Sequence, residues 1–89
     1  MLEKIKLRGR WKSKTFDLEI ESYIQAAIVE LQLAGVKEEL IQEENELVLN
    51  AITCYVKAYI GTDRTDTSKY LGMFENLKMK LTFVKPKGA

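Results

Sequence analysis

The apolar residues of positions 46–60 fall in two adjacent columns that repeat every four residues, and this pattern constrains the fold most. The columns contain Leu47, Val48, Ala51, Ile52, Tyr55, Val56, Tyr59 and Ile60. A four-residue repeat gathers these side chains on one wide helix face, whereas a half-buried strand would alternate every two residues. The pattern predicts a central, buried helix over residues 46–60, which begins at Glu44 or Asn45 and ends at Gly61.

A second helix is predicted over residues 16–34, before this central helix. Its apolar stripe consists of Ile20, Ile24, Ala27, Ile28 and Leu31. Thr15 is the expected N-cap, because its hydroxyl can accept a hydrogen bond from the first turn. Gly35 is expected to end the helix in the left-handed conformation that glycine adopts without strain.

A third helix is predicted over residues 67–81, with Asp66 as its N-cap. Its stripe consists of Tyr70, Phe74, Leu77 and Leu81. The polar segment 61–66 reads as a tight turn, and so short a connection places the last two helices antiparallel. Residues 2–7 form a short amphipathic piece, and the connection 36–43 has room for one helical turn. The fold class is therefore all-α: a small bundle of three main helices plus a short N-terminal helix.

A chain of 89 residues supports one domain, expected over residues 1–84 with a polar tail at 85–89. A core of this size is small, and such proteins often gain stability from disulfides, metals or oligomerisation. Cys54 is the only cysteine and there is no histidine, so a disulfide within the chain is excluded and a zinc site is disfavoured. Oligomerisation is the device that remains. No signal-peptide core or membrane-spanning run occurs, which favours an intracellular protein.

The charges are segregated along the chain, although the net charge is only +1. Residues 1–14 carry six bases against one acid, residues 15–46 carry nine acids against one base, and residues 47–89 carry seven bases against three acids. A basic–acidic–basic chain can pair with its own copies or with partners of either sign.

The sequence offers little for catalysis, metal binding or cofactor binding, so we expect no enzyme and no cofactor. Cys54 lies between apolar residues of the predicted central helix, where a buried filler is expected rather than an activated nucleophile. The acidic cluster of Glu38, Glu39, Glu43, Glu44 and Glu46 lacks the spacing of a calcium-binding loop. It is expected to be a solvated approach to a helix N-terminus.

The segment RGRWKSK at residues 8–14 is the most unusual stretch, because four bases surround the only tryptophan. Three interpretations stay open: contact with nucleic acid through phosphate pairing and stacking, a protein interface anchored by tryptophan and arginine, or a flexible linker whose Trp11 folds back on the core. The candidate interface residues are Arg8, Arg10, Trp11, Lys12 and Lys14 in this segment and Glu43, Glu44 and Glu46 in the acidic stretch.

Several stretches together resemble the small head–tail connector, or adaptor, proteins of tailed bacteriophages, which are also described as phage DNA-packaging proteins. Residues 15–20, TFDLEI, open the first long helix, and residues 31–36, LQLAGV, resemble the family's DL-x-x-AGV ending. Residues 51–61, AITCYVKAYIG, resemble the family's AI-x-x-YVKA-x-FG helix, with Ile60 where an aromatic residue is common. Residues 70–81 are similar to the family's last helix. These are packing patterns, so the resemblance rests on their combination.

The resemblance implies a structural role in the virion. Such proteins form a homo-oligomeric ring, expected to be dodecameric, which docks beneath the portal protein, extends the DNA channel and receives a stopper or tail-completion protein. DNA would pass transiently through the ring, no membrane is involved, and assembly would take place in the bacterial host cytoplasm. In such a ring, the basic N-terminal segment of one copy could meet the acidic middle segment of the next. The alternative interpretation is a small helical DNA-binding or regulatory protein.

Overall fold

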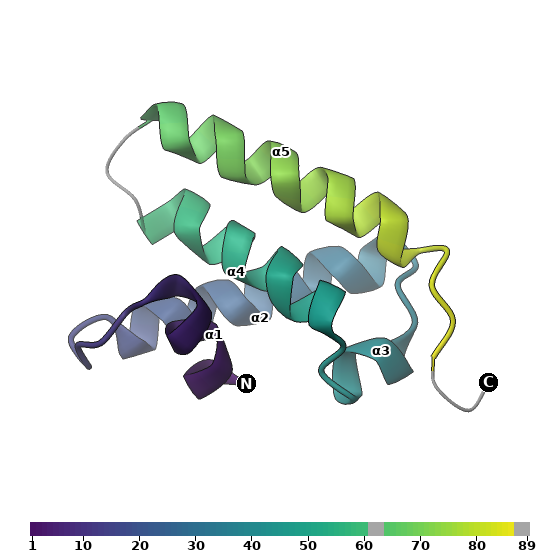
Figure 1. The fold of residues 1–89 in the computed structure, drawn as a ribbon, viewed down its shortest axis with the longest axis horizontal. Coiled ribbons are helices and arrows are strands. Elements are labelled where there is room, and N and C mark those ends of the chain that lie inside the picture. The colour runs from purple at the N-terminus through teal and green to yellow at the C-terminus, as the bar shows by residue number, and fades with distance from the viewer. Residues whose placement is uncertain (61–63, 87–89) are drawn as a thin grey trace.

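The computed structural model describes residues 1–60 and 64–86, and all regular structure within these ranges is helical. The five helices are α1 (Leu2–Gly9), α2 (Asp17–Leu33), α3 (Glu38–Gln42), α4 (Glu46–Ile60) and α5 (Arg64–Leu81). The arrangement confirms the predicted all-α bundle, and the connection before α4 holds the expected single turn as α3 (Figure 1). Residues 61–63, the first half of the predicted polar turn, and residues 87–89 of the tail lie outside the described residues, whereas residues 64–66 belong to α5 rather than to a turn.

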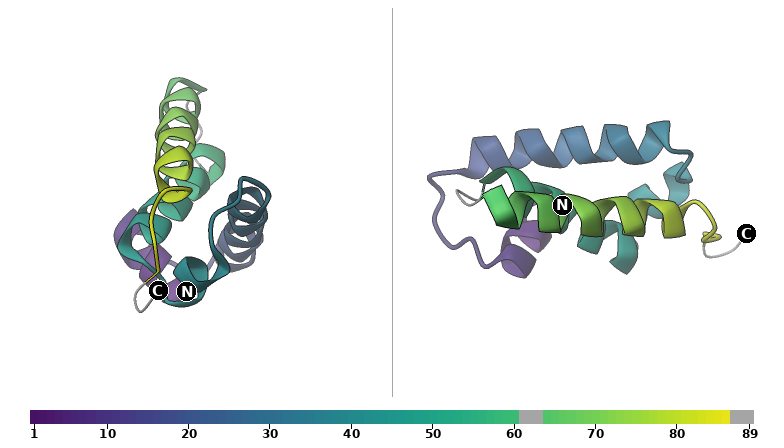
Figure 2. Two further views of the ribbon diagram at one scale, coloured as in Figure 1. Left: turned by 90° about the vertical axis from the view of Figure 1, so that its right-hand side faces the viewer. Right: turned by 90° about the horizontal axis from the view of Figure 1, so that it is seen from above.

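Helix α4 is the centre of the molecule, as its two apolar columns predict. Helices α1, α2 and α5 all pack against it. Figure 2 shows α2 and α5 on different sides of α4, and Figure 1 shows α5 lying antiparallel along it. Its buried residues are Val48, Leu49, Ala51, Ile52, Thr53, Cys54, Val56 and Ala58. Around them the core contains Ile5 of α1, the buried α2 residues Ile20, Ile24, Ala27 and Leu31, and Phe74 and Leu81 of α5, while Ile28 is half-buried.

Aromatic side chains link three of the helices. Tyr23 of α2 stacks on Tyr59 of α4 at 5.4 Å between ring centroids, and Tyr55 lies 4.8 Å from Tyr59. Tyr55 also meets Phe74 of α5 edge-on at 5.0 Å. Such pairs stabilise beyond the area they bury. Burial, followed by the neighbouring Tyr59, raises the pKa of Tyr55 to about 12.

Two of the predicted helix starts are wrong. Phe16, not Thr15, is the N-cap of α2, and it makes no side-chain capping bond. The Thr15 hydroxyl instead accepts a hydrogen bond from Ser13 at 2.8 Å, so it is turned into the preceding loop. Helix α5 begins at Arg64, which places Asp66 inside its first turn rather than at its N-cap. The apolar stripe begins only at Tyr70, so its spacing could not reveal the polar first turn.

Three helix ends share one backbone geometry, although only one of them has glycine at the left-handed position. After α2, Gly35 has a φ of 95°, and the amide of Val36 donates to the Leu31 carbonyl at 3.0 Å. The predicted left-handed end at Gly35 is therefore confirmed. Arg10 after α1 and Glu44 after α3 adopt the same left-handed conformation, with φ of 61° and 52°. A side chain makes this conformation less favourable, and helices that end in it usually have glycine at this position. Arg10 and Glu44 therefore adopt a strained backbone conformation.

Candidate interaction surface

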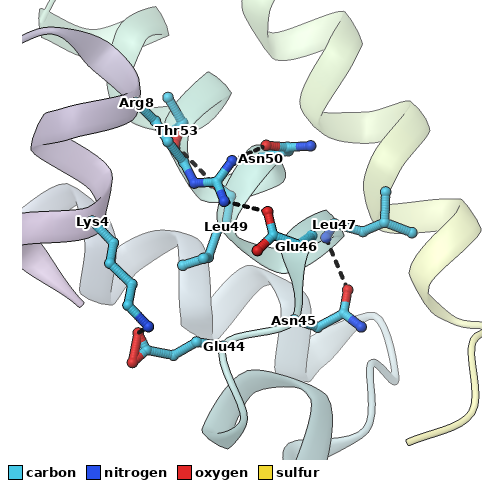
Figure 3. A network of polar contacts seen from close by, with 9 residues as sticks. All are labelled: Lys4, Arg8, Glu44, Asn45, Glu46, Leu47, Leu49, Asn50 and Thr53. Atoms are coloured by element: carbon cyan, nitrogen blue, oxygen red, sulfur yellow. Dashed lines mark hydrogen bonds and ion pairs between the residues drawn. The ribbon is translucent and has the colours of Figure 1, made fainter.

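Basic residues of α1 form ion pairs and hydrogen bonds with the rest of the bundle. Lys6 is only 8% exposed, and its ammonium lies 2.7 Å from Oδ1 of Asp17, at the start of α2. Arg8 donates to Oδ1 of Asn50 at 2.8 Å and pairs with the Glu46 carboxylate, both on α4. Lys4 lies 3.4 Å from a Glu44 carboxylate oxygen. Figure 3 shows Lys4 and Arg8 reaching from α1 to this acidic region. Three of the six bases in residues 1–14 are thus paired within the chain.

The start of α4 is organised by the same region. Asn45 accepts a hydrogen bond from the backbone amide of Leu47 at 2.8 Å through its side-chain oxygen (Figure 3). This is the N-cap that the sequence predicts at Glu44 or Asn45, and it satisfies one of the amides that a helix start leaves unpaired. Asn45, which caps α4, lies between Glu44 and Glu46, which pair with Lys4 and Arg8 of α1. The start of α4 and the docking of α1 therefore depend on the same three residues.

The other three bases of residues 1–14 remain available for contacts with another molecule. Arg10, Lys12 and Lys14 are exposed, and none of them forms an ion pair within the described part of the chain. Arg10 and Lys12 border a surface hollow of about 760 Å³ that is also lined by Glu3, Lys6, Leu7 and Trp11. Leu7, which is 81% exposed, and Trp11 supply the apolar part of this lining, and Lys6, Arg10 and Lys12 supply its basic part. A surface of this kind suits an acidic, partly apolar protein segment.

Trp11 folds back onto α1 and is packed against the core rather than projecting into solvent. Its aromatic ring lies directly over Gly9, where an added Cβ would stand 2.1 Å from the nearest ring carbon. Gly9 is therefore required by the close approach of Trp11. This placement agrees with the interpretation in which Trp11 returns to the core, and it still leaves one edge of the indole at the hollow.

The eight candidate interface residues are therefore in different situations. Arg8, Glu44 and Glu46 have partners in their own chain, while Arg10, Trp11 and Lys12 line the hollow. Lys14 and Glu43 are exposed, without an ion pair among the described residues. Leu7 is part of this surface, although it was not among the residues predicted from sequence. The sequence places Leu7 in the short amphipathic segment 2–7. Whether its side chain is buried or exposed depends on how α1 packs on α4, which the spacing does not reveal.

The described residues do not form an evident chemical site. Cys54 is buried at 8% exposure on α4, and burial raises the pKa of its thiol, although Lys57 opposes the shift. It is the buried filler that the sequence predicts. Within the described ranges, no three acidic or cysteine side chains are grouped so that they could hold a metal ion. Across the same ranges, no helix is both long and apolar enough to cross a membrane.

The comparison with protein families gives one match. The family model described as "Phage connector protein" matches residues 1–87. No curated protein and no solved structure matches the chain. The match covers nearly the full sequence, including the α1 turn, the acidic connection and all three main helices. The chain belongs to the phage connector protein family.

Proposed function

We propose that this protein is a structural subunit of the phage head–tail junction. It assembles with its own copies into a ring beneath the portal protein, extends the DNA channel and receives a stopper or tail-completion protein. The observation that carries the proposal is the family match over residues 1–87, which makes the chain a connector and implies a component of the virion. The protein acts by contact, without catalysis and without a cofactor.

The exposed charges support a contact between unlike faces of two copies. The hollow beside Trp11 carries Arg10 and Lys12 at its edge, and Lys14 follows. The acidic stretch retains Glu39 and Glu43, which are exposed and unpaired within the described residues. In the proposed ring, the hollow of one copy receives the acidic stretch of the next, a heterologous contact that closes after a fixed number of copies. The residues already paired within the chain, Arg8, Glu44 and Glu46, hold the two surfaces in place.

The test is a charge reversal at the hollow, Arg10→Glu with Lys12→Glu. Both side chains are exposed, so the monomer should stay helical by circular dichroism while self-assembly on the portal protein weakens by about tenfold or more. The matched comparison uses single reversals, Arg10→Glu against Lys85→Glu, because Lys85 is exposed and belongs to neither the hollow nor the acidic stretch. Equal assembly of these two variants, measured by sedimentation with the portal protein, would reject the hollow as the contact.

A further inference from the structure

One face of α2 is exposed and uncharged over its whole length. Leu18, Ser22, Gln25, Val29 and Leu33 follow one another at helical spacing, and all five are exposed. Leu18 and Leu33 are 89% and 79% exposed. We call these five residues the α2 stripe. The rest of α2 is acidic, with four carboxylates and no base. Asp17 pairs with Lys6 and Glu30 lies 3.9 Å from Lys78, whereas Glu19, beside the stripe, has no ion pair among the described residues.

The outer face of α5 has the complementary character. Met73 and Met79 are exposed there, and Lys69 and Lys80 lie beside them. Gly72 lies between these side chains, in the interior of the helix. We call Gly72, Met73, Asn76 and Met79 the α5 face. Neither Lys69 nor Lys80 forms an ion pair within the described part of the chain.

Nothing in the described part of the chain requires glycine at position 72. A Cβ built on Gly72 would meet no atom within 4 Å, and its φ is not in the left-handed region. Glycine inside a helix is less stable than alanine, because it loses more backbone freedom on folding. By contrast, Gly9 is explained by the Trp11 ring above it. The remaining use of Gly72 is to let another helix approach the backbone of α5 closely.

We propose that the α2 stripe of one copy packs on the α5 face of a second copy, around Gly72. This inference rests on the proposed function, because it assigns a second contact to the same assembly. Both faces are uncharged and partly apolar, one edged by carboxylates and the other by ammonium groups, and the two helices have 17 and 18 residues. Two α2 stripes together would oppose acid to acid, and two α5 faces would oppose base to base, so the pairing of unlike faces is favoured.

The geometry of the monomer agrees with a contact between copies. Helices α2 and α5 lie against α4 on different sides, as the left view of Figure 2 shows. On each helix the exposed residues named above lie opposite the buried residues that pack on the core, so both faces are turned away from the bundle. One chain therefore cannot bring its own α2 stripe onto its own α5 face. A contact between two different surfaces repeats from copy to copy, which is what a ring requires.

The first experiment compares Gly72→Ala with Gly72→Gln. Both side chains favour helix, so each variant should raise the melting temperature of the monomer, by about 4 °C for alanine. Assembly on the portal protein should weaken slightly for alanine and by about tenfold or more for glutamine, whose side chain blocks close approach. A more stable monomer with weaker assembly is an outcome that a purely structural glycine would not give. Undiminished assembly of Gly72→Gln would overturn the inference.

The second experiment identifies the two faces by cross-linking. Gln25→Cys and Asn76→Cys place a thiol near the middle of each face, and a short bis-maleimide joins thiols on neighbouring copies. Cys54 stays in place, because its burial and raised pKa slow its reaction; the unsubstituted protein is the control. A mixture of the two variants should give the mixed product, with little from either variant alone.

The outcomes separate this inference from the proposed function. Products formed as readily by one variant alone would show a contact between like faces and overturn the inference. Assembly on the portal protein without any cross-linked product would also overturn it, while the proposed function would stand. A chain that neither assembles nor binds the portal protein would contradict both.

Discussion

At the scale of single residues, two described residues other than glycine have a positive φ, a backbone conformation that a side chain disfavours. Arg10 and Glu44 both end helices in the left-handed conformation, where Gly35 shows the unstrained solution. Such strain is informative because it often persists where a side chain has a use. Glu44 holds Lys4 within the chain, whereas Arg10 has no ion pair among the described residues and borders the hollow. Sequence alone could not reveal either position, because no glycine marks the turn.

We therefore expect Arg10→Gly to separate folding from assembly. Glycine relieves the strained φ of 61°, so the free energy of unfolding should rise by about 1 kcal/mol, measured by urea denaturation. Assembly should weaken at the same time, because the hollow loses a charge. Glu44→Gly serves as the comparison: it relieves similar strain but removes the ion pair with Lys4. An Arg10→Gly variant that assembles as well as the unsubstituted protein would remove Arg10 from the interface.

At the scale of elements, apolar spacing predicted α4 to the residue and located the others. Helix α4 has apolar residues up to both ends, so its columns define its limits. Helix α5 starts with polar residues, and α2 begins at Asp17 after the N-cap Phe16, which makes no capping bond, so the predicted caps of both helices were misplaced. The pairing of Arg8 with Glu46 could not be predicted, because it depends on how α1 docks on α4 rather than on the charge of either segment.

The two residues considered as caps give a direct comparison at this scale. Asn45→Ala should lower the free energy of unfolding by about 1 kcal/mol, because the Leu47 amide loses its acceptor. Thr15→Ala should change it by less than about 0.5 kcal/mol, because Thr15 caps no helix and is exposed. Urea denaturation of both variants checks this. Equal losses would mean that Thr15 caps α2 in solution.

At the scale of the whole molecule, the bundle is held by contacts that converge on α4. The series of aromatic contacts from Tyr23 through Tyr59 and Tyr55 to Phe74 links α2, α4 and α5, and the Glu30–Lys78 pair joins α2 to α5 directly. The basic residues of α1 link the N-terminus to α2 and α4. The resulting monomer keeps two pairs of unlike surfaces exposed, the hollow with the acidic stretch and the α2 stripe with the α5 face.

The raised pKa of Tyr55 predicts that the free energy of unfolding decreases at alkaline pH. The phenol of Tyr55 keeps its proton up to about pH 12 in the folded state but only to about pH 10 in the unfolded chain. Its contribution is therefore complete below pH 10 and is lost as the pH rises from 10 towards 12, because the unfolded state releases its proton first. Urea denaturation in this range should show a smaller pH dependence for Tyr55→Phe, which keeps the aromatic contacts. An unchanged dependence would place Tyr55 in solvent.

The central claim is that copies of this connector form a closed ring on the portal. The most direct measurement is the mass and shape of the complex formed when the purified chain is mixed with the portal protein of the same phage, by native mass spectrometry and electron microscopy. The account predicts a single closed assembly with one chain per portal subunit, a continuous central channel, and loss of the added layer in the Arg10→Glu, Lys12→Glu variant. A chain that stays monomeric and does not bind the portal protein at any concentration reached would contradict it.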